Sequence, residues 1–237
     1  MTSLDQAKAV RRGESLEGVK IAAYLKTTLP GLVGPATIRQ FHSGFSNLTY
    51  LIGLGDTELV LRRPPFGRRA KSAHDMSREY RILKALKSVF PHVPEPLVYC
   101  DDPAVMDTPF YVMERLRGVI LRKEPPDATA FDAAAASRLC RRWVDLLGDL
   151  HSLDYQGCGL TDLGNPDGYV ARQIHGWSKR YRDARTDDVP DFETVMAWLC
   201  AGMPPDYSTP ALVHNDYKFD NVILDPADLT RIIGVLD

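Results

Sequence analysis

The sequence predicts an α+β protein of two lobes, a β-rich first lobe over residues 1–117 and a mostly α-helical second lobe over residues 118–237. Three observations support this prediction. Apolar and polar residues alternate in short segments between residues 36 and 62, which is the period of half-buried strands. From residue 131 to 201 the apolar residues recur at helical spacing instead. The chain of 237 residues is also long enough for two lobes that each have a core.

The first lobe is expected to contain five strands and one inserted helix. A preceding helix over residues 16–28 ends before Pro30, and the alternating segments after it indicate an antiparallel meander with a tight turn at residues 53–56. The inserted helix, over residues 72–89, ends before Pro91. The strands are predicted at residues 36–41, 49–53, 57–62, 94–99 and 110–116.

The second lobe begins near Gly118 and is predicted to be mostly helical. The strongest helical pattern covers residues 131–153, and residues 168–185 and 192–201 are further candidates. Short apolar runs return at residues 222–224 and 232–236, where we expect two small strands.

Composition limits the classes of function. The net charge is −2, but the first 117 residues carry 17 Lys and Arg against 12 Asp and Glu, and the remainder carries 12 against 19. This charge asymmetry suits a phosphate-bearing ligand in the first lobe and cations in the second. The alternative is that the charged residues simply lie on solvent-exposed surfaces of the two lobes. No basic run with aromatics favours nucleic acid, and no apolar run is long enough for a bilayer. With a polar start and four widely spaced cysteines, the sequence favours a cytoplasmic protein with reduced thiols, and a homodimer is left open.

The segment LVHNDYKFDN contains the densest group of chemically capable residues. His214, Asp216 and Asn221 match the spacing H-x-D-x-x-x-x-N of kinase catalytic loops. Asp216 could accept the proton of an attacking hydroxyl, whereas His214 is expected to brace the loop. Asn221 and Asp237 offer oxygen ligands for Mg²⁺, a hard cation. A polar turn with Asx caps is the alternative interpretation.

Six stretches together resemble a known family. They are SGFSNLTYLI, LVLRRPPFG, REYRILKAL, PFYVMERLRG, LGDLHSLDY and VHNDYKFDNVIL, in that order from residue 43 to residue 224. The sequence resembles the aminoglycoside phosphotransferase-like, or choline/aminoglycoside kinase-like, group of the protein kinase fold. More narrowly, it is similar to the phosphotransferase domains that occur alone in bacteria or fused to acyl-CoA dehydrogenase modules. The resemblance implies a bilobed protein kinase-like fold that binds ATP between its lobes.

The resemblance also implies roles for particular residues. Lys218 falls where protein kinases have a phosphate-contacting lysine, and Arg62 stands where the family usually has lysine, with Glu79 as its ion-pair partner. Arginine keeps the charge but is not equivalent to lysine. A surface role for Glu79 and a plain hairpin turn at residues 43–47 are the alternatives. The expected nucleotide contacts are Gly44, Ser46 and Asn47 at the phosphates and Met113, Glu114 and Leu116 in the connection that meets adenine.

The leading functional prediction is therefore an ATP- and Mg²⁺-dependent transfer of a phosphoryl group to a hydroxyl of a small molecule. An aminoglycoside acceptor is not required, since the visible helices supply few carboxylates for a polycation: Asp183, Asp187, Asp188, Asp191 and Glu193. The resemblance to domains fused to acyl-CoA dehydrogenases implies a hydroxylated acyl compound or another metabolic acid instead. Family members continue well beyond the position of Asp237. The chain is thus expected to be incomplete, and inactivity of this stretch alone is left open.

Two other classes compete with this prediction. Arg62 in place of lysine and the end of the sequence at Asp237 favour a non-catalytic nucleotide-binding or partner-binding module. A protein kinase is less favoured, because a long helical segment over residues 131–201 precedes the catalytic-loop pattern.

Overall fold

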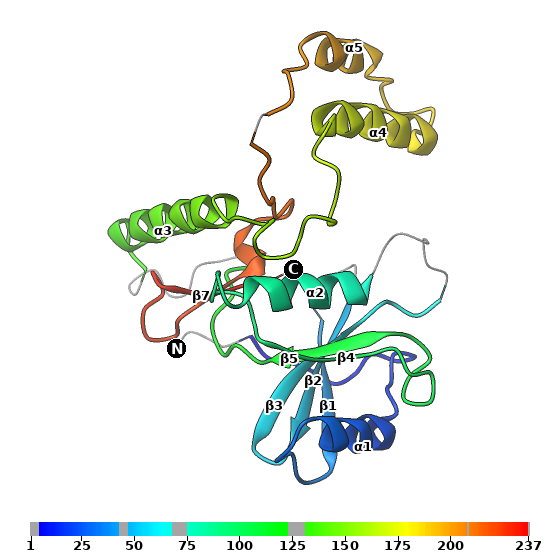
Figure 1. Cartoon of the computed structure of the whole chain (residues 1–237), viewed down its shortest axis with the longest axis vertical. Coiled ribbons are helices and arrows are strands. Elements are labelled where there is room, and N and C mark those ends of the chain that lie inside the picture. The colour runs from blue at the N-terminus through cyan, green and yellow to red at the C-terminus, as the bar shows by residue number, and fades with distance from the viewer. Residues whose placement is uncertain (1–4, 43–46, 68–74, 123–130, 208, 237) are drawn as a thin grey trace. The chain divides into compact units, whose positions relative to one another are not determined.

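The computed structural model describes residues 5–42, 47–67, 75–122, 131–207 and 209–236. The chain forms two compact units, residues 1–153 together with 213–237, and residues 154–212. The elements are, in chain order (Figure 1), α1 (Gly18–Thr28), β1 (Ala36–Phe41), β2 (Leu48–Leu54), β3 (Thr57–Arg63), α2 (Met76–Leu86), β4 (Pro96–Cys100), β5 (Phe110–Glu114), α3 (Ala133–His151), α4 (Tyr169–Ala184), α5 (Glu193–Ala201), the 3₁₀ helix η1 (Phe219–Asn221), β6 (Val222–Leu224) and β7 (Ile232–Val235).

The first unit is built on a five-stranded antiparallel sheet in the order β1-β2-β3-β5-β4. The first three strands form the predicted meander, because the turn at Gly55 and Asp56 returns the chain directly from β2 to β3. Gly55 has φ of +59°, a conformation that glycine adopts without a steric penalty. The α+β architecture predicted from the sequence is confirmed, with element ends that shift by a few residues. The lobe boundary at residue 117 stays a prediction.

The two faces of this sheet have different partners (Figure 1). On one face, Ile21 and Leu25 of α1 pack into a core with residues such as Ile52, Leu61 and Val112. The opposite face packs on α2 through the buried residues Val60, Met76, Tyr111 and Met113. Because side chains alternate along a strand, Arg62 shares the α2 face with Val60, and Tyr111 shares it with Met113. This face carries the candidate site.

A second, two-stranded sheet pairs β6 with β7. It is joined to the segment that follows β5 by two backbone hydrogen bonds between Val119 and Leu224, of 2.9 and 2.8 Å. Gly118 lies directly against β6, so that a Cβ atom at this position would overlap the Ile223 side chain and the Leu224 carbonyl oxygen. The approach of the connection to β6 therefore requires glycine at residue 118.

Substitution of Gly118 by alanine is expected to destabilise the fold by about 1–3 kcal/mol, as inserted methyl groups do in packed regions. The free energy of unfolding in urea measures the effect. Gly148, exposed in the last turn of α3, has no atom outside its own helix backbone within 4 Å of the position that a Cβ would take, and it provides the matched control. Gly148→Ala should stabilise the protein by roughly 0.5–1 kcal/mol through helix propensity. Equal effects of the two substitutions would contradict the packing requirement at Gly118.

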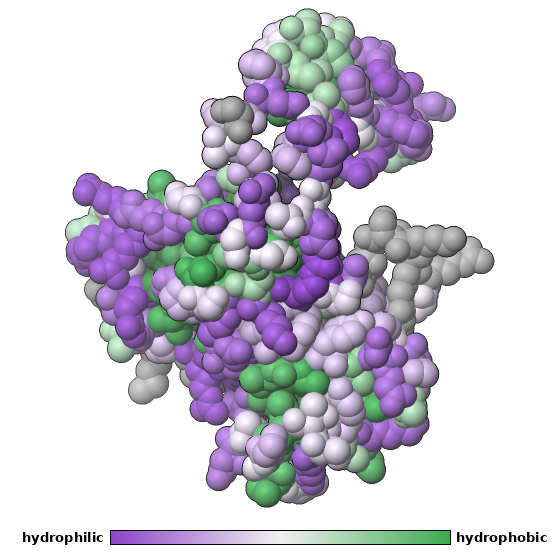
Figure 2. Space-filling model, viewed as in Figure 1, coloured by the Kyte–Doolittle hydropathy of each residue, from purple (hydrophilic) through white to green (hydrophobic). Residues whose placement is uncertain are grey.

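The second unit contains α4 and α5. Tyr181 packs on Phe192, with ring centroids 5.4 Å apart, and Arg182 binds both carboxylate oxygens of Glu193 at 2.7 and 2.6 Å. Hydrophobic surface is visible over α5 in Figure 2, where Trp198 is 71 % exposed. Among the helices in the described ranges of both units, none is long and apolar enough to cross a membrane.

Candidate active site

The loop between residues 213 and 221 is held by Leu236, the residue after β7, and by a contact within the loop. His214 Nε2 lies 2.9 Å from the carbonyl oxygen of Leu236, and the backbone N–H of Asp216 donates to His214 Nδ1 at 3.4 Å. Both contacts are satisfied when the imidazole carries its proton on Nε2. Asn215 has φ of +62°, a left-handed conformation that asparagine tolerates better than most residues. His214 thus links the loop to Leu236, and its role as the residue that braces a catalytic loop stays a prediction.

An aromatic contact holds the same loop on α3. Tyr217 stacks on Trp143, with ring centroids 4.5 Å apart, and its hydroxyl donates to the Trp143 carbonyl oxygen at 3.0 Å. Burial raises the pKa of Tyr217 to about 12. Phe219 also packs on Trp143, with ring centroids 5.3 Å apart. Trp143 on α3 therefore supports the loop through both aromatic contacts.

Asp216 is surrounded by groups that stabilise its ionised form. Lys218 Nζ lies 2.8 Å from Asp216 Oδ2, and Asn221 Nδ2 donates to the same oxygen at 3.0 Å and to the Asp216 carbonyl at 3.1 Å. The hydrogen bond from Lys218 is the main reason why the pKa of Asp216 is lowered. The charge of Lys218 and the hydrogen bond from Asn221 lower it further, and they outweigh the partial loss of hydration, which acts in the opposite direction. Asp216 is therefore a carboxylate at neutral pH, with its side chain 57 % exposed.

The opposite wall is built on β3, β5 and α2. Arg62 is 8 % exposed, and its Nε lies 3.4 Å from Glu79 Oε2, so the expected ion pair is present. Glu79 also accepts hydrogen bonds from Asn47 Nδ2 at 2.6 Å and from the Tyr111 hydroxyl at 3.1 Å. Arg62 and Tyr111 are cross-strand partners in the sheet, which places both side chains beside α2. Two hydrogen bonds thus fix the Glu79 carboxylate, which is paired by charge with Arg62.

The last residue of β5, Glu114, has a side-chain carboxylate that is already engaged. Glu114 Oε1 accepts from Lys87 Nζ at 2.8 Å and from the Glu95 N–H at 2.7 Å. The Glu114 backbone N–H donates to the Glu95 carbonyl at 2.9 Å. The side chain of Glu114 is therefore structural. An adenine contact in this segment would use the Glu114 carbonyl or the N–H of Leu116.

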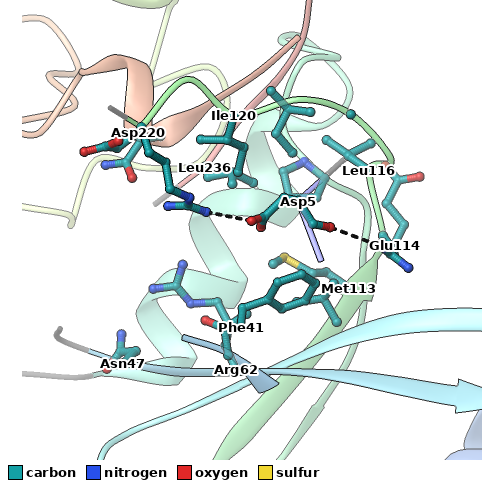
Figure 3. Close-up of a pocket in the computed structure, with 18 of the residues that line it drawn as sticks. Asp5, Phe41, Asn47, Arg62, Met113, Glu114, Leu116, Ile120, Asp220 and Leu236 are labelled. Carbon is teal, nitrogen blue, oxygen red and sulfur yellow. Dashed lines mark hydrogen bonds and ion pairs between the residues drawn. The ribbon is translucent and has the colours of Figure 1, made fainter. Parts of the chain in front are cut away.

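These two walls line one cavity of about 470 Å³ within the first unit (Figure 3). This volume lies in the usual range for small-molecule and cofactor sites. Apolar side chains gather at the end near Met113 and Leu116, where Asp5 and Glu114 also line the cavity, and the other end carries amide, ammonium, guanidinium and carboxylate groups. The apolar members include Val60, Met113, Leu116, Ile120, Ile223 and Leu236. The polar members include Asn47, Arg62, Asp216, Lys218, Asp220 and Asn221.

The structure brings together most, but not all, of the residues predicted for the site. Asn47, Arg62, Met113, Glu114, Leu116, Asp216, Lys218 and Asn221 line the cavity, and Glu79 and His214 support it from behind. Gly44, Ser46 and Asp237 lie outside the described residues. The roles of all these residues stay predictions.

The side-chain oxygens of the site supply some of the ligands that a hard divalent cation would need. The amide nitrogen of Asn221 is directed at Asp216, so its side-chain oxygen is the atom that could coordinate, and the carboxylates of Asp216 and Asp220 line the same cavity. Within the described ranges, no group of three or more His, Cys, Asp and Glu side chains could hold a metal by itself. The magnesium site predicted at Asn221 and Asp237 stays a prediction.

Several residues of the site were not predicted from the sequence, among them Tyr111, which lies behind the cavity wall, and Asp5 and Arg122, which are part of its lining. Tyr111 donates a hydrogen bond to Glu79 and is the cross-strand partner of Arg62. This position follows from the register between β3 and β5, but the sequence does not show that these two strands pair. Asp5 and Arg122 line the cavity as well, and no local pattern in the sequence indicates their participation.

Comparison with solved structures identifies the class to which this architecture belongs, the kinase-like fold. A protein from Ralstonia eutropha that has been assigned to the aminoglycoside phosphotransferases is similar with a TM-score of 0.79 and 28 % identity, over 94 % of this chain and 64 % of that chain. The fold is shared by the streptomycin–ATP complex of APH(2″)-IIa, with a TM-score of 0.61 and 17 % identity over 94 % of this chain and 70 % of that chain. It is also shared by choline kinase from Cryptosporidium parvum, with a TM-score of 0.61 and 13 % identity over 92 % of this chain and 63 % of that chain.

Residues 37–237 match the phosphotransferase enzyme family, and the chain belongs to this family. Curated relatives include acyl-CoA dehydrogenase family member 11 from Gallus gallus, 37 % identical over 96 % of this chain, and family member 10 from Mus musculus, 36 % identical over 97 %. The chain spans 29 % and 21 % of the lengths of these two proteins. The family resemblance stated from the sequence is confirmed.

Proposed function

We propose that this chain transfers the γ-phosphoryl group of ATP to a hydroxyl group of a small molecule. One observation carries the proposal: the oriented Arg62 and the Asp216–Lys218–Asn221 group line the same cavity from opposite walls. Membership in a phosphotransferase family and the ATP complex of a neighbour with the same fold support it. The apolar end suits a nucleoside, and the end with Arg62 and Lys218 suits phosphates.

The residues of the site suit the chemical requirements of this reaction. The acceptor oxygen forms a bond to the γ-phosphorus while the bond from that phosphorus to the β–γ bridging oxygen breaks, and ADP leaves with the electron pair. Asp216 would accept the hydroxyl proton and pass it to water. Arg62 and Lys218 would balance charge on the phosphate oxygens, which is the principal electrostatic need of phosphoryl transfer. Bound Mg²⁺, held by Asn221 and the predicted Asp237, would neutralise further phosphate charge.

The acceptor is proposed to be a hydroxylated acyl compound or another metabolic acid. The names of the curated relatives support an acyl substrate. The acidic residues of the second unit give little support for a polycation, because Asp183 is paired with Lys179 at 2.6 Å and Glu193 with Arg182. Asp188 accepts a hydrogen bond from the Thr186 hydroxyl.

The test is ATP turnover in the presence of Mg²⁺ against hydroxylated carboxylic acids, their thioesters, choline and an aminoglycoside. The experiment should use the longest natural form of the protein. Acceptor-dependent ADP release is the expected result. Saturable ATP binding without turnover on any acceptor would favour the non-catalytic module. Sedimentation of the same sample would test the homodimer, which stays a prediction.

The pH dependence provides a separate prediction. Lys218→Met removes the main cause of the lowered pKa of Asp216, so the pKa should rise. Since a protonated Asp216 cannot accept a proton, activity is lost as the pH falls through this pKa. The acidic limb of kcat/KM should therefore move to higher pH in the variant, whatever its maximal rate. Lys179→Met, which breaks an exposed pair with Asp183, is the control. An unmoved acidic limb in the Lys218 variant would contradict proton transfer to Asp216.

A further inference from the structure

The segment before α1 is packed onto the sheet as an additional edge. We call residues 5–14 the N-terminal arm. Lys8 and Gln40 of β1 exchange two backbone hydrogen bonds of 2.8 and 2.9 Å, and Ala7 is 2 % exposed. Gln40, which is fully buried, also accepts from the Arg11 N–H at 2.9 Å. Glu14 accepts from the hydroxyl of the buried Tyr50 at 2.8 Å through its carbonyl. The arm is therefore anchored along its length.

The start of the arm reaches the segment that follows β5. The Asp5 N–H donates to the Gly118 carbonyl at 3.2 Å, and Arg115 Nη2 donates to the Asp5 carbonyl at 3.2 Å. The Asp5 carboxylate lies 3.1 Å from Arg122 Nη2, in an ion pair whose side chains are 28 % and 34 % exposed. Asp5 is thus held by one backbone contact and two arginines.

This position is at the apolar end of the cavity. Figure 3 shows Asp5 close to Leu116, Ile120 and Met113, and away from Asn47 at the polar end. Asp5 and Arg122 both line the cavity. Asp216 and Arg62, which are proposed to serve the reacting phosphates, line the polar end. The arm therefore contributes a wall where the nucleoside is expected.

We propose that the N-terminal arm forms the outer wall of the nucleoside end of this site, and that the Asp5–Arg122 ion pair keeps the wall closed on a bound nucleotide. The inference rests on the proposed function. A partly buried ion pair that joins two chain segments restricts their separation, which slows release of a ligand enclosed between them. The arm would select for the nucleoside, while the triphosphate is held elsewhere.

The experiment compares ATP with inorganic tripolyphosphate, which lacks the nucleoside. Binding of each is measured by calorimetry on the parent, Asp5→Asn, Arg122→Gln and the reversed pair Asp5→Arg/Arg122→Asp. We expect the Kd of ATP to rise roughly three- to tenfold in each single variant, as for loss of one charged contact. The Kd of tripolyphosphate should not change, and the reversed pair should recover part of the ATP affinity.

The control is Glu17→Gln, which breaks an exposed ion pair with Lys20 on α1, away from the cavity. It should leave both affinities unchanged. Parental ATP affinity in the Asp5 and Arg122 variants, tighter ATP binding, or equal losses for ATP and tripolyphosphate would each overturn the inference while the proposed function stands. A parent protein that binds no ATP would overturn both, and so the two failures can be told apart.

Discussion

Asp216→Asn is expected to lower kcat for phosphoryl transfer by about 100- to 10,000-fold, the usual contribution of a positioned general base. The amide retains the shape of the side chain and can still receive the hydrogen bonds of Lys218 and Asn221, which lie at 2.8 and 3.0 Å. It cannot accept the hydroxyl proton. The loss should therefore appear in kcat, with little change in the Kd of ATP, when steady-state turnover and nucleotide binding are measured on the same preparation.

Asp183→Asn is the matched control for this substitution. Asp183 is also an exposed aspartate paired with a lysine, at 2.6 Å from Lys179, but it does not line the cavity. Its variant should turn over at the parental rate. An Asp216 variant that is as fast as the parent would remove this residue from the mechanism, and loss of nucleotide binding would mean that it acts through binding.

Much of the architecture could be predicted because its determinants are local. Alternation between residues 36 and 62 predicts β1, β2 and β3, since each of these strands has one face in the α1 core and the other facing α2. The helical pattern predicts α3, where Leu139, Leu146 and Leu150 are buried. The catalytic-loop spacing predicts that Asp216 and Asn221 lie close together. They do so because the short segment between them turns back through the 3₁₀ helix η1, which ends at Asn221.

The parts of the site that were missed depend on contacts between distant segments. Tyr111 reaches Glu79 only because β5 pairs with β3 in a register that sets Tyr111 opposite Arg62. Alternation fixes the face on which a residue lies but not its cross-strand partner. Asp5 is still less accessible to prediction, since its contacts with Gly118 and Arg122 depend on the path of a segment without regular structure.

Arg62→Ala is expected to lower kcat/KM for ATP on the order of 100-fold, as for loss of one electrostatic donor in a preorganised site. Arg62 is buried on the α2 face of β3, and Glu79 orients it with help from Asn47 and Tyr111. Alanine removes the cation and leaves the carboxylate of Glu79 without its charge partner. Arg62→Lys keeps a positive charge and introduces the residue that the family usually has here, so it should recover some of the activity that Arg62→Ala loses. The recovery should be only partial, because lysine lacks the second and third nitrogens of a guanidinium.

The two readings of arginine at this position give opposite results in the lysine variant. If Arg62 marks a site that has lost catalysis, Arg62→Lys should create or strongly raise turnover over the parent. If the Glu79 network adapts the site to arginine, Arg62→Lys should be slower than the parent and faster than Arg62→Ala. Arg39→Ala removes an exposed arginine from β1 and controls for the loss of positive charge. It should leave kcat/KM for ATP unchanged. Thermal unfolding of each variant separates lost phosphate binding from lost folding, since Glu79 is only 29 % exposed and removal of the Arg62 charge beside it also destabilises the fold.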